Sequence, residues 1–288
     1  MKFEITNKNK ILFPESEISK EDFINYYKKI SKKIIPLIAN RPITLQRFPD
    51  GIEGEIFFQK KAMEYYPKWI KTVSIKKQDG SSIDMPLVTD LDSLLYIANQ
   101  VGVIHIWLSK IDKLNYPDRI VFDLDPDRNN FAQVIEVAKG LKKILDLLKL
   151  PSFFMTTGSK GIHVIVPIKP EYVFDEVKEF ARNIASILSN TDPEKYTIEP
   201  RKEKRKNKVY IDYLRNSYAA TQVAPYSIRP KEHAPIATPI SFRELNKNLT
   251  SQKFNIKNIF KRRSYPFNNM DSKKVSLKKA LLDIKKYI

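Results

Sequence analysis

Two aspartates separated by a single residue are the first candidates for chemistry in this chain. The segment 119–126 alternates in the manner of a β-strand, so Asp123 and Asp125 project from one face while Phe122 and Leu124 project from the other. Two carboxylates at this spacing repel each other unless a divalent cation lies between them, and their oxygens suit Mg²⁺ or Mn²⁺. A solvent-facing pair is the alternative. The apolar neighbours put the pair at the end of a buried strand, and this location favours a metal site.

A third aspartate, Asp212, lies on an apolar segment, 209–214, that we expect to form a strand. An unpaired charge on such a strand is costly, so this carboxylate needs a partner. The partner is either a metal shared with the first two aspartates or a salt bridge to an arginine such as Arg205 or Arg215.

The segment 156–163 combines two glycines, hydroxyl groups, a cation and an imidazole between two expected strands. Such a turn can present N–H groups to a phosphate, and Thr157, Ser159, Lys160 and His163 are the side chains that could join them. An ordinary surface turn followed by a hydrogen-bonded strand histidine is the alternative. The position of His163 directly after the turn favours a ligand contact.

Two further cations, Arg229 and Lys231, follow the segment 224–228 and could lie on a triphosphate. A polar loop with surface charges is the ordinary expectation for such a segment. Taken alone, this motif decides nothing.

Charge and composition restrict the partners of the chain. Lys and Arg number 51 against 33 Asp and Glu, a net charge of +18 that makes nucleic acid the leading partner, with a lysine-rich surface that merely solvates the chain as the alternative. The chain contains no cysteine, which excludes disulfides, thiolate zinc sites and cysteine nucleophiles. With no charged-then-apolar leader and no apolar run of membrane-spanning length, these features predict a cytoplasmic protein.

The pattern of apolar residues predicts mixed α and β structure without repeats. Helices are expected at 19–39 with Ser19 as N-cap, and at 90–100, 131–150, 174–188 and from about 275. Strands are expected at 44–48, 56–58, 119–126, 153–157, 162–168 and 209–214. Residues 71–90, with Lys71, Lys76 and Lys77 before the Asp79-Gly80 turn, predict a basic hairpin, and the cluster 201–208 predicts a solvated loop.

Taken in order, these segments resemble the polymerase domain of bacterial ligase D and its stand-alone archaeal relatives in the archaeo-eukaryotic primase superfamily. The resemblance covers about residues 5–245 and leaves a basic, helical C-terminal segment at about 246–288. The matching motifs are Thr6 to Pro14, Arg41-Pro42, Pro49-Asp50-Gly51, Phe57 to Lys60, His105-Ile106-Trp107, Phe122 to Pro126, Gly158 to His163, Ile211 to Asn216, Val223 to Arg229, and Ala234 to Pro239.

The resemblance implies roles for individual residues. It assigns Asp123, Asp125 and Asp212 to two catalytic metal ions, Mn²⁺ or Mg²⁺. The remaining assignments concern nucleotide and DNA: Lys160, His163 and Arg229 on the incoming triphosphate, His105 near its sugar, Phe58 on its base, Arg205 as an active-site arginine, and Lys10 with Lys20 on a DNA 5′-phosphate. The chain departs from the family at Thr157, where serine is common, and at Lys231, where arginine is frequent and where the bidentate fork is lost.

The resemblance also implies an α+β primase-polymerase fold over 1–288, with an RRM-like palm sheet, packed helices and an N-terminal α/β portion. The expected activity is template-directed extension of primer 3′-hydroxyl ends at gaps and double-strand breaks during non-homologous end joining, with ribonucleotides favoured. Expected partners are broken DNA, NTP or dNTP, Ku, and a DNA ligase on a separate chain, in a cytoplasmic, nucleoid-associated setting. Three rivals remain at this point: a replicative primase, a metal-dependent phosphoesterase, and a non-catalytic DNA-binding module.

Overall fold

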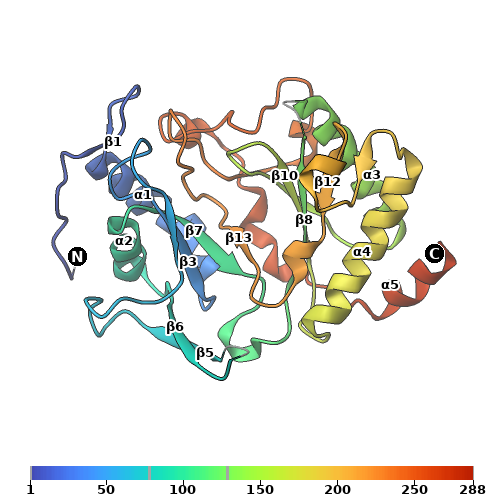
Figure 1. Cartoon of the computed structure of the whole chain (residues 1–288), viewed down its shortest axis with the longest axis horizontal. Coiled ribbons are helices and arrows are strands. Elements are labelled where there is room, and N and C mark those ends of the chain that lie inside the picture. The colour runs from blue at the N-terminus through green and yellow to red at the C-terminus, as the bar shows by residue number, and fades with distance from the viewer. Residues whose placement is uncertain (1, 77–78, 128–129, 288) are drawn as a thin grey trace. The chain divides into compact units, whose positions relative to one another are not determined.

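The computed structural model describes residues 2–76, 79–127 and 130–287, and it divides into two compact units (Figure 1). The first unit comprises Met1–Asp112, Thr221–Ala237 and Phe254–Lys261, and the second comprises Lys113–Ala220, Thr238–Lys253 and Arg262–Ile288. Lys77, which the sequence places in the basic hairpin, lies outside the described residues.

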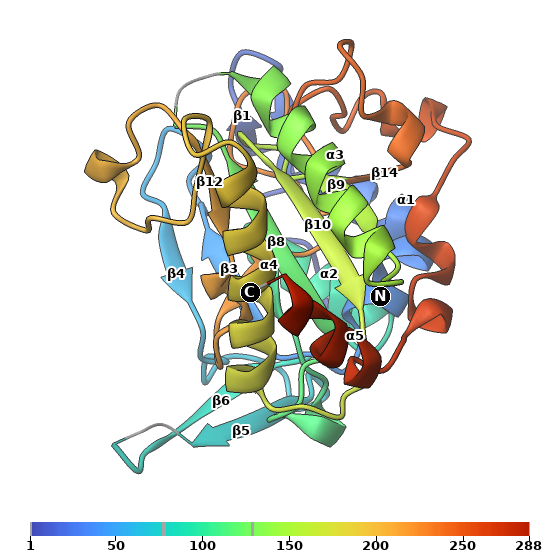
Figure 2. The same ribbon diagram turned by 90° about the vertical axis from the view of Figure 1, so that its right-hand side faces the viewer.

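The second unit is built on a β-α-β-β-α-β order of elements. These are β8 (Arg119–Asp125), α3 (Phe131–Leu147), β9 (Phe153–Thr156), β10 (Ile162–Pro167), α4 (Phe174–Thr191) and β12 (Val209–Asp212). Their spatial order is β12-β8-β10-β9, which is the 4-1-3-2 arrangement of an RRM-like sheet, and β11 (Tyr196–Thr197) and β14 (Thr238–Ile240) extend its edges. Figure 2 shows α3 and α4 on the same face of this sheet. The RRM-like palm sheet is therefore present.

Apolar spacing explains why these two helices lie on the sheet. In α3 the side chains of Val134, Ala138, Leu141 and Leu145 recur at three- and four-residue steps and are buried. Residues Val177, Phe180, Ala181, Ile184 and Leu188 form the corresponding buried stripe of α4. Fully burying each large apolar side chain stabilises the fold by about 1.5–3 kcal/mol, so these two stripes hold the helices against the strands.

The first unit contains a four-stranded antiparallel sheet in the order β13-β7-β3-β4. Its strands are β13 (Thr221–Val223), β7 (Gly102–Trp107), β3 (Ile43–Arg47) and β4 (Phe57–Gln59). Helices α1 (Lys20–Ile38) and α2 (Leu91–Asn99) pack against each other, and two hairpins pair β1 (Ile11–Phe13) with β2 (Ile18–Ser19) and β5 (Thr72–Lys76) with β6 (Ser82–Pro86). The α/β portion and the 71–90 hairpin are thus confirmed. Strand β7 was not expected.

Local sequence sets the start of α1. Ser19 accepts a hydrogen bond from the Asp22 N–H, and the Asp22 side chain accepts one from the Ser19 N–H, which together form the capping box of this helix. Predicting Ser19 as the N-cap was therefore correct.

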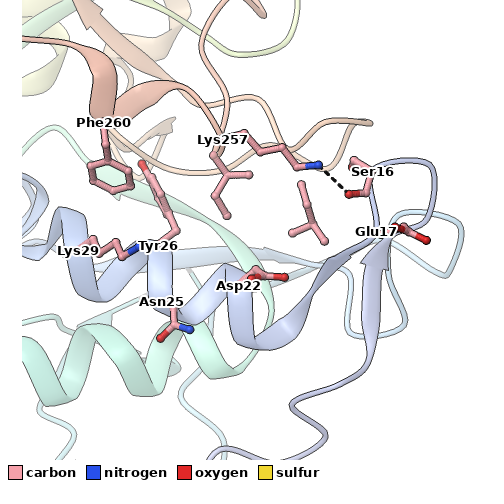
Figure 3. Close-up of a pocket in the computed structure, with 10 residues that line it drawn as sticks. Ser16, Glu17, Asp22, Asn25, Tyr26, Lys29, Lys257 and Phe260 are labelled. Carbon is pink, nitrogen blue, oxygen red and sulfur yellow. Dashed lines mark hydrogen bonds between the residues drawn. The ribbon is translucent and has the colours of Figure 1, made fainter.

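A late segment of the chain returns to α1 and borders a pocket of about 500 Å³ (Figure 3). Phe260 lies against Tyr26 with ring centroids 5.9 Å apart, and Lys29 lies over the Phe260 ring. Lys257 donates a hydrogen bond to the Ser16 carbonyl oxygen at 3.0 Å. Residues 254–261 of the first unit therefore pack against α1 and the turn before it.

Two sequence-based boundaries differ from the structure. The strand expected at 209–214 ends at Asp212, because Leu214–Asn216 forms a 3-10 turn, η3. The C-terminal segment expected to be helical consists mainly of short 3-10 turns, and its one α-helix, among the described residues, is α5 (Lys278–Asp283). Within the same described ranges, no helix is long and apolar enough to span a bilayer.

Candidate functional site

Three adjacent strands of the second unit bring a histidine and two aspartates into one row. In the register of the sheet, Asp123 on β8 lies opposite His163 on β10 and opposite Asp212 on β12. Directly opposite residues share a face, with Cβ atoms about 4.5–5.5 Å apart. The next row, Ile162, Leu124 and Ile211, is fully buried on the other face. A charged row and an apolar row therefore alternate across the same three strands.

Asp123 is the centre of the charged row. Its Oδ1 lies 3.3 Å from His163 Nε2, and its Oδ2 accepts a hydrogen bond from Arg215 Nε at 3.1 Å. The contact with His163 lacks hydrogen-bond alignment, so Asp123 Oδ1 is a buried oxygen without a hydrogen-bond partner within the described residues. The other ring nitrogen of the histidine, His163 Nδ1, is likewise buried without a partner there. Buried polar atoms of this kind are costly unless a ligand satisfies them.

Asp212 is held by three groups. Its Oδ1 accepts hydrogen bonds from the Leu214 N–H at 2.8 Å and from the Tyr210 hydroxyl at 3.3 Å. Its Oδ2 lies 3.3 Å from Arg215 Nε. The salt bridge to Arg215, one of the two arginines considered from the sequence, is therefore formed, and Arg215 joins Asp212 to Asp123.

Asn216 fixes the turn that carries Arg215. Its side-chain oxygen accepts a hydrogen bond from the Val121 N–H, and its side-chain nitrogen donates to the carbonyl oxygens of Val121 and Tyr213. Since Asn216 is fully buried, it fastens η3 to strand β8. The guanidinium of Arg215 is thereby presented to the carboxylates from a rigid base.

The carboxylates influence one another strongly. Burial acts to raise the pKa of Asp123, but His163 and Arg215 outweigh it and hold that pKa at about 2. The negative charge of Asp123, followed by burial, raises the pKa of Asp125 to about 7. Burial also raises the pKa of Asp212, against the opposing effect of Arg215. A cluster in which one carboxylate resists ionisation because of another has a deficit of positive charge.

The donor set fits a hard divalent cation. Three carboxylates lie on adjacent strands, and Asp123 Oδ1 is a buried oxygen with no hydrogen bond in the described part of the chain. As the side chains stand, no three His, Asp or Glu residues among those described close on a common point that could hold a metal. The Oδ2 atoms of Asp123 and Asp212 both contact Arg215 instead. The chemistry of the donors therefore fits a divalent metal.

The turn between β9 and β10 is organised by a threonine. The hydroxyl of Thr157 accepts hydrogen bonds from the N–H groups of Ser159 and Gly161 and lies 3.3 Å from the Ser251 hydroxyl. Two of the N–H groups that we expected to face a phosphate are thus used inside the turn. Thr157 is buried and shapes the turn, whereas Lys160 is exposed.

Gly161 has a steric reason to be glycine. A Cβ at this position would lie 2.1 Å from the Leu124 carbonyl oxygen and 2.9 Å from Asp125 Oδ1. The turn can therefore approach the carboxylate strand this closely because residue 161 lacks a side chain.

Arg205 lies beside the cluster without contacting a carboxylate. Its guanidinium carbon is 3.8 Å from the centre of the Tyr210 ring, and its nitrogens donate to the carbonyl oxygens of Glu199 and Pro200. Because Tyr210 donates to Asp212, Arg205 reaches the charged row through one intermediate ring.

The first unit holds the other candidates for nucleotide binding. Phe58 on β4 is 61% exposed and makes an edge-on contact with His105 on β7, with centroids 5.9 Å apart. Arg229 and Lys231 follow β13 and are partly exposed. An exposed aromatic ring beside an imidazole is a surface on which a base can stack.

Lys10 and Lys20 share a second pocket of the first unit, of about 430 Å³, together with Arg47 and Asp50. The Lys20 N–H donates to the Lys10 carbonyl oxygen at 2.8 Å, which joins the two residues despite their separation in sequence. Burial, followed by the charges of Lys10 and Arg47, lowers the pKa of Lys20. Asp50 forms an ion pair with Lys10. Cations crowded in this way favour an anionic ligand.

Sequence reasoning missed residues both in the carboxylate cluster and in the pocket that holds Lys10 and Lys20. Arg215 was considered only as a bridge to Asp212, and Tyr210, Arg47 and the ion pair of Asp50 were not anticipated. Tyr210 could have been found by alternation, because it lies two residues before Asp212 on the same face of the strand. Arg47 and Asp50 could not have been found from the sequence, since only the fold brings them close to Lys10.

Comparison with known proteins agrees with this geometry. The family model for the LigD primase-polymerase domain matches residues 19–266. The bifunctional non-homologous end joining protein LigD of Bacillus subtilis is 33% identical over 264 residues, which cover 91% of this chain and 42% of that protein. The multifunctional LigD of Mycolicibacterium smegmatis is 31% identical over 245 residues, 84% of this chain and 32% of that protein. The chain therefore spans less than half the length of these relatives.

A solved structure gives the same result for the fold. The polymerase domain of Mycobacterium tuberculosis ligase D, in complex with DNA, matches with a TM-score of 0.89 and 26% identity, covering 95% of this chain and 99% of that one. The RRM-like sheet and the extent of these matches agree with one another. This chain belongs to the LigD primase-polymerase domain family and is a polymerase of the nucleotidyltransferase type.

Proposed function

We propose that this chain extends primer 3′-hydroxyl ends at gaps and double-strand breaks by template-directed nucleotide addition, as a polymerase of non-homologous end joining. The observation that carries the proposal is the buried row of Asp212, Asp123 and His163 on one face of a primase-type sheet, with Asp125 two residues along. The names of the LigD relatives place those proteins in end joining, and the matched solved domain is bound to DNA.

In the proposed mechanism, Asp123, Asp125 and Asp212 hold two divalent ions, Mn²⁺ or Mg²⁺. When bound, such ions stabilise the attacking and leaving oxygens of an in-line displacement at the α-phosphate. The residues of the chain orient these carboxylates: Tyr210 and the Leu214 N–H fix Asp212, and Gly161 allows the phosphate-side turn to approach Asp125.

The incoming triphosphate is the proposed ligand of the turn and of nearby cations. Ser159, Lys160 and His163 contact its phosphates in the second unit, while the Thr157 hydroxyl keeps the turn in shape. Lysine and imidazole groups can offset the charge that develops on the phosphates during transfer. Arg205 acts beside them through its contact with Tyr210.

Residues of the first unit have proposed roles in nucleotide binding, taken from the resemblance to the family. Phe58 stacks on the base, His105 lies near the sugar and contributes to a preference for ribonucleotides, and Arg229 and Lys231 supply charge to the phosphates. The edge-on contact of Phe58 with His105 supports the first two roles, since it places an exposed ring next to a hydrogen-bonding group.

Broken DNA is the proposed partner, and Lys10 with Lys20 is the proposed pocket for a 5′-phosphate at the far side of a gap. A terminal phosphate carries more charge than an internal phosphodiester and can accept charge-assisted hydrogen bonds from both ammonium groups. Ku as recruiter, cooperation with a DNA ligase, one catalytic unit over 1–288 and a cytoplasmic, nucleoid-associated setting are further parts of the proposal, taken from the resemblance to the family.

Primer extension on a gapped, 5′-phosphorylated duplex tests the proposed function, with NTPs and dNTPs compared in Mn²⁺ and in Mg²⁺. We expect template-directed addition that depends on the divalent ion and favours ribonucleotides. Addition without any primer would favour the replicative primase instead, and release of phosphate from DNA without primer extension would favour a phosphoesterase.

A further inference from the structure

We propose that Arg215 is a built-in counter-cation of the carboxylate cluster, which a divalent metal has to displace, so that this arginine sets the metal affinity of the site. The inference rests on the proposed metal-binding role of Asp123 and Asp212 and adds a residue that controls it.

The position of the guanidinium carries the argument. A single atom, Arg215 Nε, lies 3.1 Å from Asp123 Oδ2 and 3.3 Å from Asp212 Oδ2. Both carboxylates belong to neighbouring strands, and a cation that bridges them lies where a shared metal ion would be expected to bridge them. A guanidinium has no lone pair to offer a metal and repels it by charge. Arg215 and a bridging metal therefore exclude each other at these two oxygens.

The surroundings of Arg215 allow it to leave. Its backbone is fixed by η3, which Asn216 fastens to β8. Its side chain is 42% exposed, and within the described residues its ion pairs are with these two carboxylates alone. The guanidinium can thus swing into solvent while the turn and the strand stay in place.

Competition of this kind has a measurable size. A ligand that must displace an internal group binds more weakly than it would to the empty site. The loss of affinity equals the equilibrium constant with which the internal group occupies that site. Two charge-assisted contacts, weakened by the partial exposure of Arg215, correspond to a factor of roughly ten. Removing the guanidinium should therefore raise the affinity for Mn²⁺ alone about tenfold.

A second consequence links metal binding to the nucleotide. A metal that arrives with a triphosphate brings phosphate oxygens, which can pair with the displaced guanidinium, whereas the metal alone leaves it unpaired. The affinity for Mn²⁺ should therefore rise more in the presence of triphosphate for the parent chain than for a variant without the guanidinium.

The experiment uses the full chain and three variants. Arg215→Gln removes the guanidinium charge, and Arg215→Lys keeps a positive charge without the fork. Arg182→Gln is the matched control, because Arg182 forms an exposed ion pair with Glu179 on α4. Isothermal titration measures Mn²⁺ binding, and thermal unfolding is followed in EDTA and in saturating Mn²⁺. Far-UV circular dichroism confirms that each variant is folded.

We expect Arg215→Gln to bind Mn²⁺ about tenfold more tightly, Arg215→Lys to lie between it and the parent, and Arg182→Gln to match the parent. Arg215→Gln should also unfold at a lower temperature than the parent in EDTA and lose that difference in Mn²⁺. Unchanged or weaker Mn²⁺ binding by Arg215→Gln would overturn the inference.

Failure of this inference is distinguishable from failure of the proposed function. If the parent binds Mn²⁺ and Asp123→Asn does not, while the Arg215 variants behave like the parent, only the role of Arg215 is wrong. If the parent binds no Mn²⁺ at the cluster, the metal assignment and the role of Arg215 fail together.

Discussion

The carboxylate cluster of the second unit gathers negative charges, and the cationic pocket of the first unit gathers positive charges. In the cluster, Asp123 raises the pKa of Asp125, and in the pocket, Lys10 and Arg47 add to burial in lowering the pKa of Lys20. Both arrangements cost the folded chain electrostatic free energy until a ligand of the opposite charge arrives. Stored like-charge repulsion is therefore a property of sites prepared for a ligand.

The carboxylate cluster and the cationic pocket differ in how rigidly the fold holds their side chains. The cluster lies on three central strands, and its internal counter-ion, Arg215, is carried by a turn that Asn216 locks to β8. The pocket is formed largely by loops and element ends, and its internal counter-ion, Asp50, is 68% exposed. Chemistry needs fixed atoms, whereas docking of a phosphate tolerates a more adaptable surface. The difference suggests that the first place is for catalysis and the second for positioning DNA.

The largest expected effect separates these two roles. Asp123→Asn should lower nucleotide addition by at least about a hundredfold, because it removes the central carboxylate of the cluster. DNA affinity should stay near that of the parent, since phosphate contacts come from basic groups. Primer extension and fluorescence anisotropy on the same gapped duplex measure the two quantities. Asp146→Asn, in an exposed ion pair on α3, is the control, and near-normal extension by Asp123→Asn would break the comparison.

The next effect concerns the stored repulsion itself. The charge of Asp123, followed by burial, raises the pKa of the Asp125 carboxyl to about 7 in the folded chain, against an ordinary pKa of about 3.9 in the unfolded chain. Ionisation therefore costs the folded state nothing below pH 4, increasingly more from pH 4 to 7, and the full amount above pH 7. In EDTA, Asp125→Asn should be more stable than the parent by about 1–4 kcal/mol at pH 8 and equal to it near pH 4. Urea unfolding at both pH values measures this, and a difference independent of pH would contradict it.

A smaller effect is expected at the cationic pocket. The parent should prefer a gap with a 5′-phosphate, and Lys10→Ala/Lys20→Ala should bind phosphorylated and unphosphorylated gaps alike, a loss of about tenfold to a hundredfold. Fluorescence titration at moderate salt measures both ligands. The double variant Lys285→Ala/Lys286→Ala removes the same charge from exposed C-terminal positions and should keep the preference. A parent without any preference would remove the end-recognition role.

The smallest effect tests the internal counter-ion of the pocket. Asp50→Asn frees Lys10 from its exposed ion pair, so affinity for a 5′-phosphorylated gap should rise by about two- to fivefold. Affinity for an unphosphorylated gap should change less, because fewer oxygens are there to use the freed ammonium group. An equal rise for both ligands would mean that Asp50 acts only through net charge.

Several features of this protein follow from local sequence. Alternation around Asp123 and Asp125, the three- and four-residue steps of α3, and the capping residues Ser19 and Asp22 act over a few positions. Physical rules of short range are sufficient to predict such elements. The main strands and helices, the shared face of Asp123 and Asp125, and the α+β class were therefore predictable.

Other features depend on contacts between distant parts of the chain. Strand β7 is almost continuously buried, so it lacks the alternation that reveals a half-exposed strand, and it was missed. The strand at 209–214 stops at Asp212 because Asn216 bonds to Val121, more than ninety residues earlier. The apolar character of the sequence continues past Asp212, so it could not indicate where the strand ends.

For the candidate site, the sequence by itself determined the donor atoms, and the tertiary structure decided which of them meet. Residue types alone identify carboxylates, lysines and a histidine as metal or phosphate ligands, since their chemistry does not depend on the fold. The pairing of Asp123 with His163 and Asp212 is set by sheet register, and the bridge through Arg215 is set by the turn after β12. Register and turn geometry arise from long-range packing, so the cation between the carboxylates becomes visible only once the strands are side by side.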